Sequence, residues 1–245
     1  MLEIAHVGGM KIKGCWECEA NYLFNENRRV DYKLYDMVFI VSIRGEKMDD
    51  ILLESSLIHQ KAEKLLRDFQ IVEMWKSIGA DVRTVGSFRS NLMIDKDIDL
   101  HVYTSELDAA KTFQALTPLL GDSRVIKCKY INGAETDEHC LEWHIALKYF
   151  SDEIWTLDMI QILAGSALDG FFEETTDAII RALTPETRLT ILKLKKAAPA
   201  ENYICGIEFY KAVLQDHIRT WKEFEQWRKS NPLEGMMYWR PKVLK

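Results

Sequence analysis

The segment VGSFRSNLMIDKDIDLHVY, residues 85–103, contains the pattern that decides the fold. Its end alternates as a β-strand does, and the apolar positions share one face: Ile98, Leu100 and Val102. The polar positions share the other face: Asp97, Asp99 and His101. Two carboxylates this close on one face repel each other and stay ionised only when a positive species offsets them. The strand therefore predicts a cation site at one edge of a sheet.

A third carboxylate, Asp158, lies in the apolar run WTLDMI, residues 155–160, which reads as another strand. An isolated carboxylate in such a run is costly to bury, so we expect Asp158 to point at a partner. Oxygen ligands suit hard divalent cations, and Mg2+ usually takes one or two carboxylates together with substrate phosphates. We therefore predict that Asp97, Asp99 and Asp158 hold Mg2+ or Mn2+, as two ions.

A Gly-Ser pair stands upstream of the aspartates. Gly86 lets the backbone turn sharply at the end of a strand. The amides of Ser87 and Phe88 would then open a short helix whose N-terminus favours a phosphate, and the Ser87 hydroxyl adds a donor. Carboxylates that hold Mg2+ beside a phosphate cradle predict a site for a nucleoside triphosphate such as ATP.

GSFRSNLMIDKDID, residues 86–99, followed by the distant strand Asp158, resembles the nucleotidyltransferase superfamily in its DNA polymerase beta-like form. The resemblance covers about residues 85–160. Ser90 and Asn91 stand where that pattern has a second Arg and a Gly, so one phosphate contact of the family is not matched. The resemblance implies a mixed sheet flanked by helices.

The resemblance also implies roles for the acidic residues. Asp97 and Asp99 would bind both metals, while Asp158 would hold the catalytic metal and help to activate an acceptor hydroxyl. Two ions about 4 Å apart can stabilise both the attacking and the leaving oxygen of an in-line displacement. A nucleoside monophosphate would pass to the acceptor and pyrophosphate would leave.

Further residues are weaker candidates. Arg89 is a candidate phosphate ligand, and the candidate substrate contacts are His101, His144 and Lys211. His144 shares a strand face with Glu142, and Lys211 lies on a predicted helix that would cover the nucleotide by topological analogy. The lysines at 193, 195 and 196 are interpreted as a solvated helix face.

The rest of the chain completes an α/β (α+β) prediction. The spacing predicts helices at 49–69 and 71–78, a strand at 82–85, a helix at 107–121, and strands at 124–131, 140–150 and 153–162. After Gly170 the chain reads as helical, with a helix start at Thr184-Pro185-Glu186. We expect three domains: a peripheral, β-rich N-terminal extension (1–47), a nucleotidyltransferase core (48–168) and a helical C-terminal region (169–245).

Composition limits the alternatives. A formal net charge of −6 over 245 residues disfavours non-specific nucleic-acid binding and favours a small molecule or a protein as the hydroxyl acceptor. No membrane segment or secretory signal is evident, and five scattered cysteines suggest reduced thiols in a cytoplasmic protein. Cys15 and Cys18 form a lone C-x-x-C, interpreted as two strand cysteines. The sequence leaves two other functions open: a catalytically weak nucleotide-binding or toxin-antitoxin-type module, and a pyrophosphate transferase. It also leaves open whether the protein forms a homodimer.

Overall fold

The computed structural model describes residues 2–7, 10–15, 49–136, 138–199, 204–233 and 238–241. The chain divides into two compact units, Met1–Lys47 and Met48–Lys245. In the first unit, β1 (Leu2–Val7) and β2 (Met10–Cys15) pair antiparallel. The second half of the C-x-x-C, Cys18, lies outside the described residues, as does most of the expected strand structure between 16 and 45.

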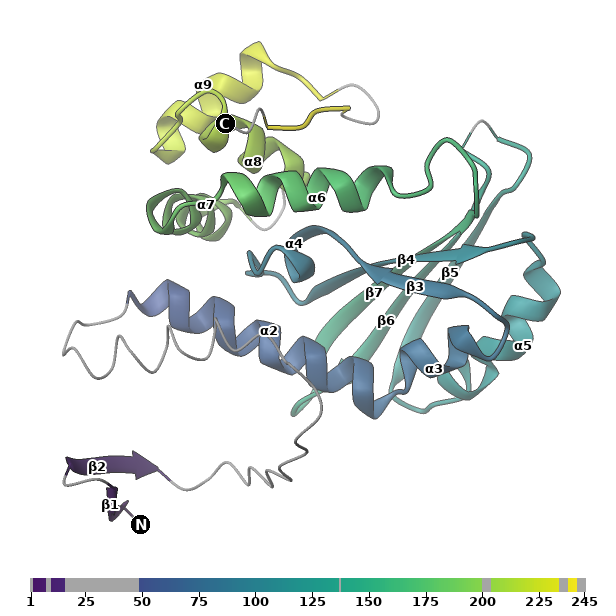
Figure 1. Ribbon diagram of the computed structural model, residues 1–245, viewed down its shortest axis with the longest axis horizontal. Helices are drawn as coiled ribbons and strands as arrows, with labels where there is room; N and C mark the ends of the chain where they lie inside the picture. Colours follow the sequence, from purple (N-terminus) through teal and green to yellow (C-terminus); the bar gives the residue numbers. More distant parts are fainter. Residues whose placement is uncertain are drawn as a thin grey trace. The chain divides into compact units, whose positions relative to one another are not determined.

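A five-stranded mixed sheet with the order β3-β4-β7-β6-β5 organises the second unit (Figure 1). Its strands are β3 (Asp81–Thr84), β4 (Asp97–Thr104), β5 (Val125–Gly133), β6 (Cys140–Tyr149) and β7 (Glu153–Leu163). The β4 and β7 strands run parallel, and the other neighbours pair antiparallel. The predicted mixed sheet is thereby confirmed, and the parallel pair carries the aspartates.

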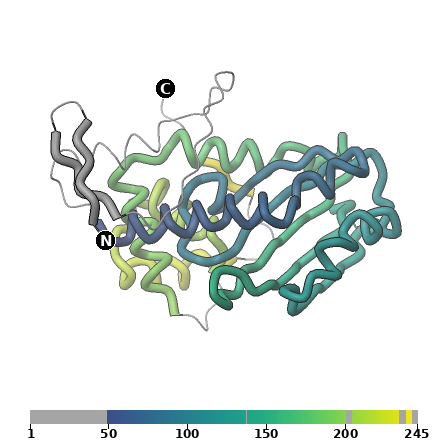
Figure 2. Tube along the Cα trace, turned by 90° about the horizontal axis from the view of Figure 1, so that it is seen from below, coloured from purple at the N-terminus to yellow at the C-terminus, as the bar shows by residue number. Residues whose placement is uncertain are grey.

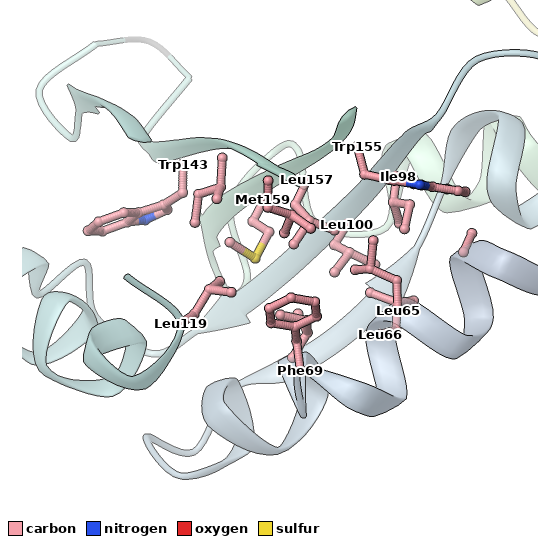
Figure 3. Close-up of a cluster of buried hydrophobic side chains, with 14 of the residues drawn as sticks. Leu65, Leu66, Phe69, Ile98, Leu100, Leu119, Trp143, Trp155, Leu157 and Met159 are labelled. Carbon is pink, nitrogen blue, oxygen red and sulfur yellow. The ribbon is translucent and has the colours of Figure 1, made fainter. Parts of the chain in front are cut away.

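One face of the sheet packs on α2 (Asp50–Asp68), α3 (Ile71–Lys76) and α5 (Ala109–Leu120) (Figure 1). Asp49 caps α2 by accepting a hydrogen bond from the Ile51 amide at 3.3 Å, as an N-cap residue does. Apolar side chains of β4 and β7 meet Leu65 of α2 and Phe69, which follows the end of α2, in this core (Figure 3). Figure 2 views this layer from below, with α2 crossing in front of the strands.

The other face of the sheet carries the polar residues of β4 and lies on the side of α4 (Gly86–Arg89) and the C-terminal helices (Figure 1). These helices are α6 (Phe171–Ala182), α7 (Pro185–Ala197), α8 (Gly206–Leu214) and α9 (Trp221–Ser230). They form a second core that includes Leu92, from the loop after α4. The predicted boundary at 168/169 falls between β7 and α6 and stays a prediction. Among the described residues, no helix is both long and apolar enough to cross a lipid bilayer.

Candidate active site

The structure brings the three predicted aspartates together. Because β4 and β7 are parallel neighbours, Asp99 lies directly beside Asp158, and Asp97 lies beside Thr156. One carboxylate oxygen of each aspartate lies within 4.8 Å of the others. Three acidic side chains from two strands thus form one cluster on the polar face of the sheet.

The three neighbouring carboxylates of this cluster repel one another when ionised, and a bound cation would stabilise them. Burial, and then the charges of Asp97 and Asp158, raise the pKa of Asp99 to about 7. Burial also raises the pKa of Asp97, although the Thr156 hydroxyl donates to its Oδ1 at 2.6 Å and partly offsets the shift. A divalent ion would relieve the repulsion, and a set of carboxylate oxygens is the donor chemistry that Mg2+ and Mn2+ prefer. The residues present therefore fit the predicted metal.

The Gly-Ser pair is positioned against this cluster. Gly86 has φ of +61°, in the region that favours glycine, and a Cβ at this position would overlap Oδ2 of Asp99. The amide of Val85 donates to the carbonyl of Asp99 at 3.2 Å, which ties the end of β3 to β4. Only glycine allows the backbone to approach the carboxylate this closely, and Ser87 follows it at the wall of a cavity.

This cavity has a volume of about 800 Å³ and opens beside the aspartates. Its floor includes the three aspartates with Thr156 and Ile160 of β7, and Gly86 and Ser87 form part of one wall. The helical region supplies the remaining wall: Phe172, Thr175, Thr176 and Ile179 of α6, Lys195 of α7, and Cys205, Gly206, Ile207, Phe209 and Tyr210 at α8. The combination of apolar walls with a few convergent polar groups is typical of a small-molecule site.

Lys195 is a site residue that the sequence interpretation missed. Its Nζ donates to the carbonyl of Leu92 at 3.0 Å, and it lines the cavity. Burial lowers the pKa of Lys195, while the nearby carboxylates, including Asp99, oppose the shift. The solvated-face interpretation is correct for the exposed Lys193 and Lys196 and wrong for Lys195. The available signal was helical spacing, because Lys195 lies four residues after the buried Ile191.

The two histidines take different positions. His101 lines the cavity and is buried, with Nδ1 at 3.3 Å from Oε1 of Glu173 on α6. His144 lies between two carboxylates: its Nδ1 is 2.8 Å from Oδ1 of Asp158, and its Nε2 is 2.8 Å from Oε2 of Glu142. Burial lowers the pKa of His144, but the hydrogen bonds to Glu142 and Asp158 outweigh burial and raise it overall. His144 therefore orients the Asp158 carboxylate.

Two other predicted residues lie away from the cavity lining. Arg89 forms an ion pair with Asp177 of α6, its Nη2 at 2.7 Å from Oδ1, and so joins α4 to α6. Lys211 has its Nζ 6.0 Å from the centre of the Trp227 ring on α9. Neither residue is among those that line the cavity. In this structure, Arg89 and Lys211 therefore contact side chains of other helices and not the cavity.

Comparison with known proteins gives structural neighbours alone. No family model and no curated protein matches the chain. A crystal structure of the Cid1 poly(U) polymerase with bound MgGTP matches at 16% identity and a TM-score of 0.48, over 75% of this chain and 55% of that one. A structure of the GLD-2/RNP-8 complex matches at 14% identity and a TM-score of 0.39, over 77% of this chain and 79% of that one.

Another matching structure of Cid1 is described as a basis for the RNA terminal uridylyl transferase activity of that protein. The chain spans about half the length of the Cid1 structures that it matches. At these TM-scores the similarity by itself assigns neither an activity nor a substrate to this chain.

Proposed function

We propose that this chain is a metal-dependent nucleotidyltransferase that moves a nucleoside monophosphate from a nucleoside triphosphate to an acceptor hydroxyl. The observation that carries the proposal is the cluster of Asp97, Asp99 and Asp158 at the floor of a cavity of about 800 Å³. The acidic composition favours acceptor hydroxyls on small molecules or proteins.

The residues of the site would have distinct roles in the reaction. Asp97, Asp99 and Asp158 would hold divalent ions, which, when bound, supply positive charge to the phosphate oxygens. Gly86 lets Ser87 approach the triphosphate, and Lys195 on α7 supplies a cation at the cavity lining. Fixed charges of this kind stabilise the charge that develops during phosphoryl transfer.

The transfer step is a substitution at the α-phosphorus. The acceptor oxygen forms a bond to the α-phosphorus, and the bond from that phosphorus to the bridging oxygen of the β-phosphate breaks. Pyrophosphate leaves with the electron pair of the broken bond. The proton of the acceptor hydroxyl passes to a carboxylate oxygen of Asp158, which His144 holds in place through Oδ1. Positioning accounts for much of the rate in such reactions.

Label transfer tests the proposal. The protein is incubated with each α-labelled triphosphate, Mg2+ or Mn2+, and a panel of small-molecule, protein and oligonucleotide acceptors. We expect label on an acceptor with the wild type and none with Asp97→Asn. Label transfer that persists in Asp97→Asn would refute the metal assignment.

The alternative is a nucleotide-binding or toxin-antitoxin-type module with little turnover. Thermal stability separates it from the enzyme, because a ligand that binds only the folded state raises the melting temperature. The enzyme proposal requires Mg-ATP or another Mg-triphosphate to stabilise the wild type and not Asp99→Asn. Stabilisation of both proteins, without any label transfer, would favour the non-catalytic module.

A further inference from the structure

The short helix α4 ends in a turn directly beside the Gly-Ser pair. The amide of Asn91 donates to the carbonyl of Phe88 at 3.2 Å, and the amide of Leu92 donates to the carbonyl of Ser87 at 2.8 Å. These two bonds form a Schellman motif, in which the residue after the helix C-cap is left-handed. Asn91 is that residue, with φ of +58°. Asparagine adopts this conformation more readily than most residues, so it preserves the turn where the family pattern has Gly.

Neighbouring helices hold this turn, residues 88–92, which we call the α4 turn. The imidazole of His59 on α2 stacks on the ring of Phe88, and its Nε2 lies 3.1 Å from the carbonyl oxygen of Phe88. Arg89 pairs with Asp177 of α6. In Figure 1, α4 lies between the sheet and the helices α6 and α7. The position of the α4 turn is therefore set by tertiary contacts as well as by its own hydrogen bonds.

Two cations of α7 donate to successive carbonyls of the α4 turn. Nη2 of Arg188 donates to the carbonyl of Asn91 at 2.8 Å, and Nζ of Lys195 donates to the carbonyl of Leu92 at 3.0 Å. Arg188 and Lys195 are seven residues apart, which is close to two helical turns, so they share one face of α7. This face of α7 thus binds the end of α4.

Arg188 is a buried cation without a counter-charge. Burial lowers its pKa, and no carboxylate of the described residues forms an ion pair with it to offset the shift. Its Nε is also buried without a hydrogen-bond partner in the described part of the chain. An unpaired buried charge costs stability. Features that cost stability are expected where they serve a functional site.

The α4 turn connects Arg188 to the cavity. Arg188 does not line the cavity, but Ser87 and Lys195 do. The bond from the Leu92 amide fixes Ser87, and the Leu92 carbonyl accepts from Lys195. A lysine ammonium has three donors, so Lys195 can keep this bond and still donate to a ligand in the cavity.

We propose that Arg188 is a positioning residue of the triphosphate subsite, which it serves by holding the carbonyl of Asn91 and with it the α4 turn. The turn in this position directs Ser87 and Lys195 to the same triphosphate. This inference rests on the proposed nucleotidyl transfer and adds to it a residue that does not touch the substrate. Divalent ions alone should bind independently of Arg188, because the three aspartates stand on β4 and β7.

A purely structural role for Arg188 predicts a different result. If Arg188 only packs α7 against α4, its variants melt at a lower temperature, while the folded protein binds triphosphate as the wild type does. Arg219 provides a matched control, because its Nη1 donates to the carbonyls of Val213 and Ile218 at 3.1 and 3.0 Å. Arg219 likewise holds carbonyls near the end of a helix, α8, and it does not line the cavity.

Calorimetric titration of the full chain, at a temperature at which every variant is folded, tests the inference without turnover. The ligands are the Mg2+ complexes of non-hydrolysable ATP, GTP, CTP and UTP analogues and, separately, Mn2+ alone. We expect Arg188→Gln to weaken triphosphate binding roughly 10-fold, as loss of a charged hydrogen bond does, and to leave Mn2+ binding unchanged. Arg188→Met, which fills similar space and removes the buried charge, should show the same loss in a stably folded protein.

The other variants make the result specific. Arg188→Lys keeps a donor for the Asn91 carbonyl and should recover most of the affinity, and Arg219→Gln should bind triphosphate as the wild type does. Because Arg188 and Lys195 hold one turn, Arg188→Gln should weaken binding less in a Lys195→Gln background than in the wild type.

Four results would overturn the inference: wild-type affinity in Arg188→Gln or Arg188→Met, an equal loss in Arg219→Gln, a parallel loss of Mn2+ binding, or additive losses with Lys195→Gln. Arg188→Lys that binds no better than Arg188→Gln would also overturn it, because the donor would then have no role. Failure of the wild type to bind any of the four triphosphates would overturn the proposed function itself, and this inference with it.

Discussion

Substitution of Gly86 by alanine has two separable effects: it strains the backbone, and it displaces the Asp99 carboxylate. The left-handed φ of +61° costs alanine about 1–2 kcal/mol. In a chain of this size, that loss lowers the melting temperature by roughly 2–8 °C. The added Cβ also overlaps Oδ2 of Asp99, so the carboxylate or α4 must shift by about 1 Å. A misplacement of that size costs ~10²-fold in rate.

Gly79→Ala is the matched control. Gly79 has φ of +81°, and a Cβ there would meet nothing within 4 Å. Both variants should melt at a lower temperature than the wild type, because both force alanine into the left-handed region. Gly79→Ala should still be stabilised by Mg-ATP and should transfer label at the wild-type rate, whereas Gly86→Ala should do neither. Wild-type rate and Mg-ATP stabilisation in Gly86→Ala would refute the inferred role of this close approach.

Three further outcomes follow from the site. Lys195→Gln should raise the KM for the triphosphate roughly 10-fold or more, as loss of a charged hydrogen bond does, while the exposed Lys193→Gln should not. The pKa of Asp99 is about 7 in the folded state, against an ordinary value of 3.8. Between these two pH values the folded state holds a proton that the unfolded state has lost, so the wild type loses stability as the pH rises. In EDTA, the stability of Asp99→Asn relative to wild type should therefore increase from about pH 4 to pH 7 in urea melts, and a constant difference would contradict the shift. His144→Ala should weaken Mn2+ binding by ~10–100-fold in calorimetric titrations, with a smaller effect from Glu142→Gln.

The strand alternation around Asp97 and Asp99 was sufficient to predict which face of the sheet carries the aspartate cluster. Period-2 patterning identifies which side chains share a face, and an acid in the apolar run around Asp158 indicated the partner strand. The parallel pairing that places Asp99 beside Asp158 is a long-range contact, which local patterning does not specify. The resemblance of residues 86–99 implied that the three carboxylates share metal ions, without specifying how their strands pair.

The wall of the cavity was harder to predict because it comes from tertiary packing. Lys195 was assigned to a solvated face together with Lys193 and Lys196, which are indeed exposed, because charge alone does not distinguish the three lysines. Arg89 lies two residues after Ser87, yet its guanidinium pairs with Asp177, 88 residues further along the chain. Such partners become evident only when the helical layer is packed against the sheet.

The central claim is that three carboxylates jointly hold divalent ions at the site of transfer. Anomalous diffraction from crystals grown with Mn2+ and a non-hydrolysable triphosphate tests it most directly. We expect Mn2+ peaks within about 2.0–2.5 Å of oxygens from Asp97, Asp99 and Asp158, with the triphosphate in the cavity beside Ser87 and Lys195. A bound triphosphate with its Mn2+ away from these carboxylates, or no Mn2+ among them, would contradict the claim.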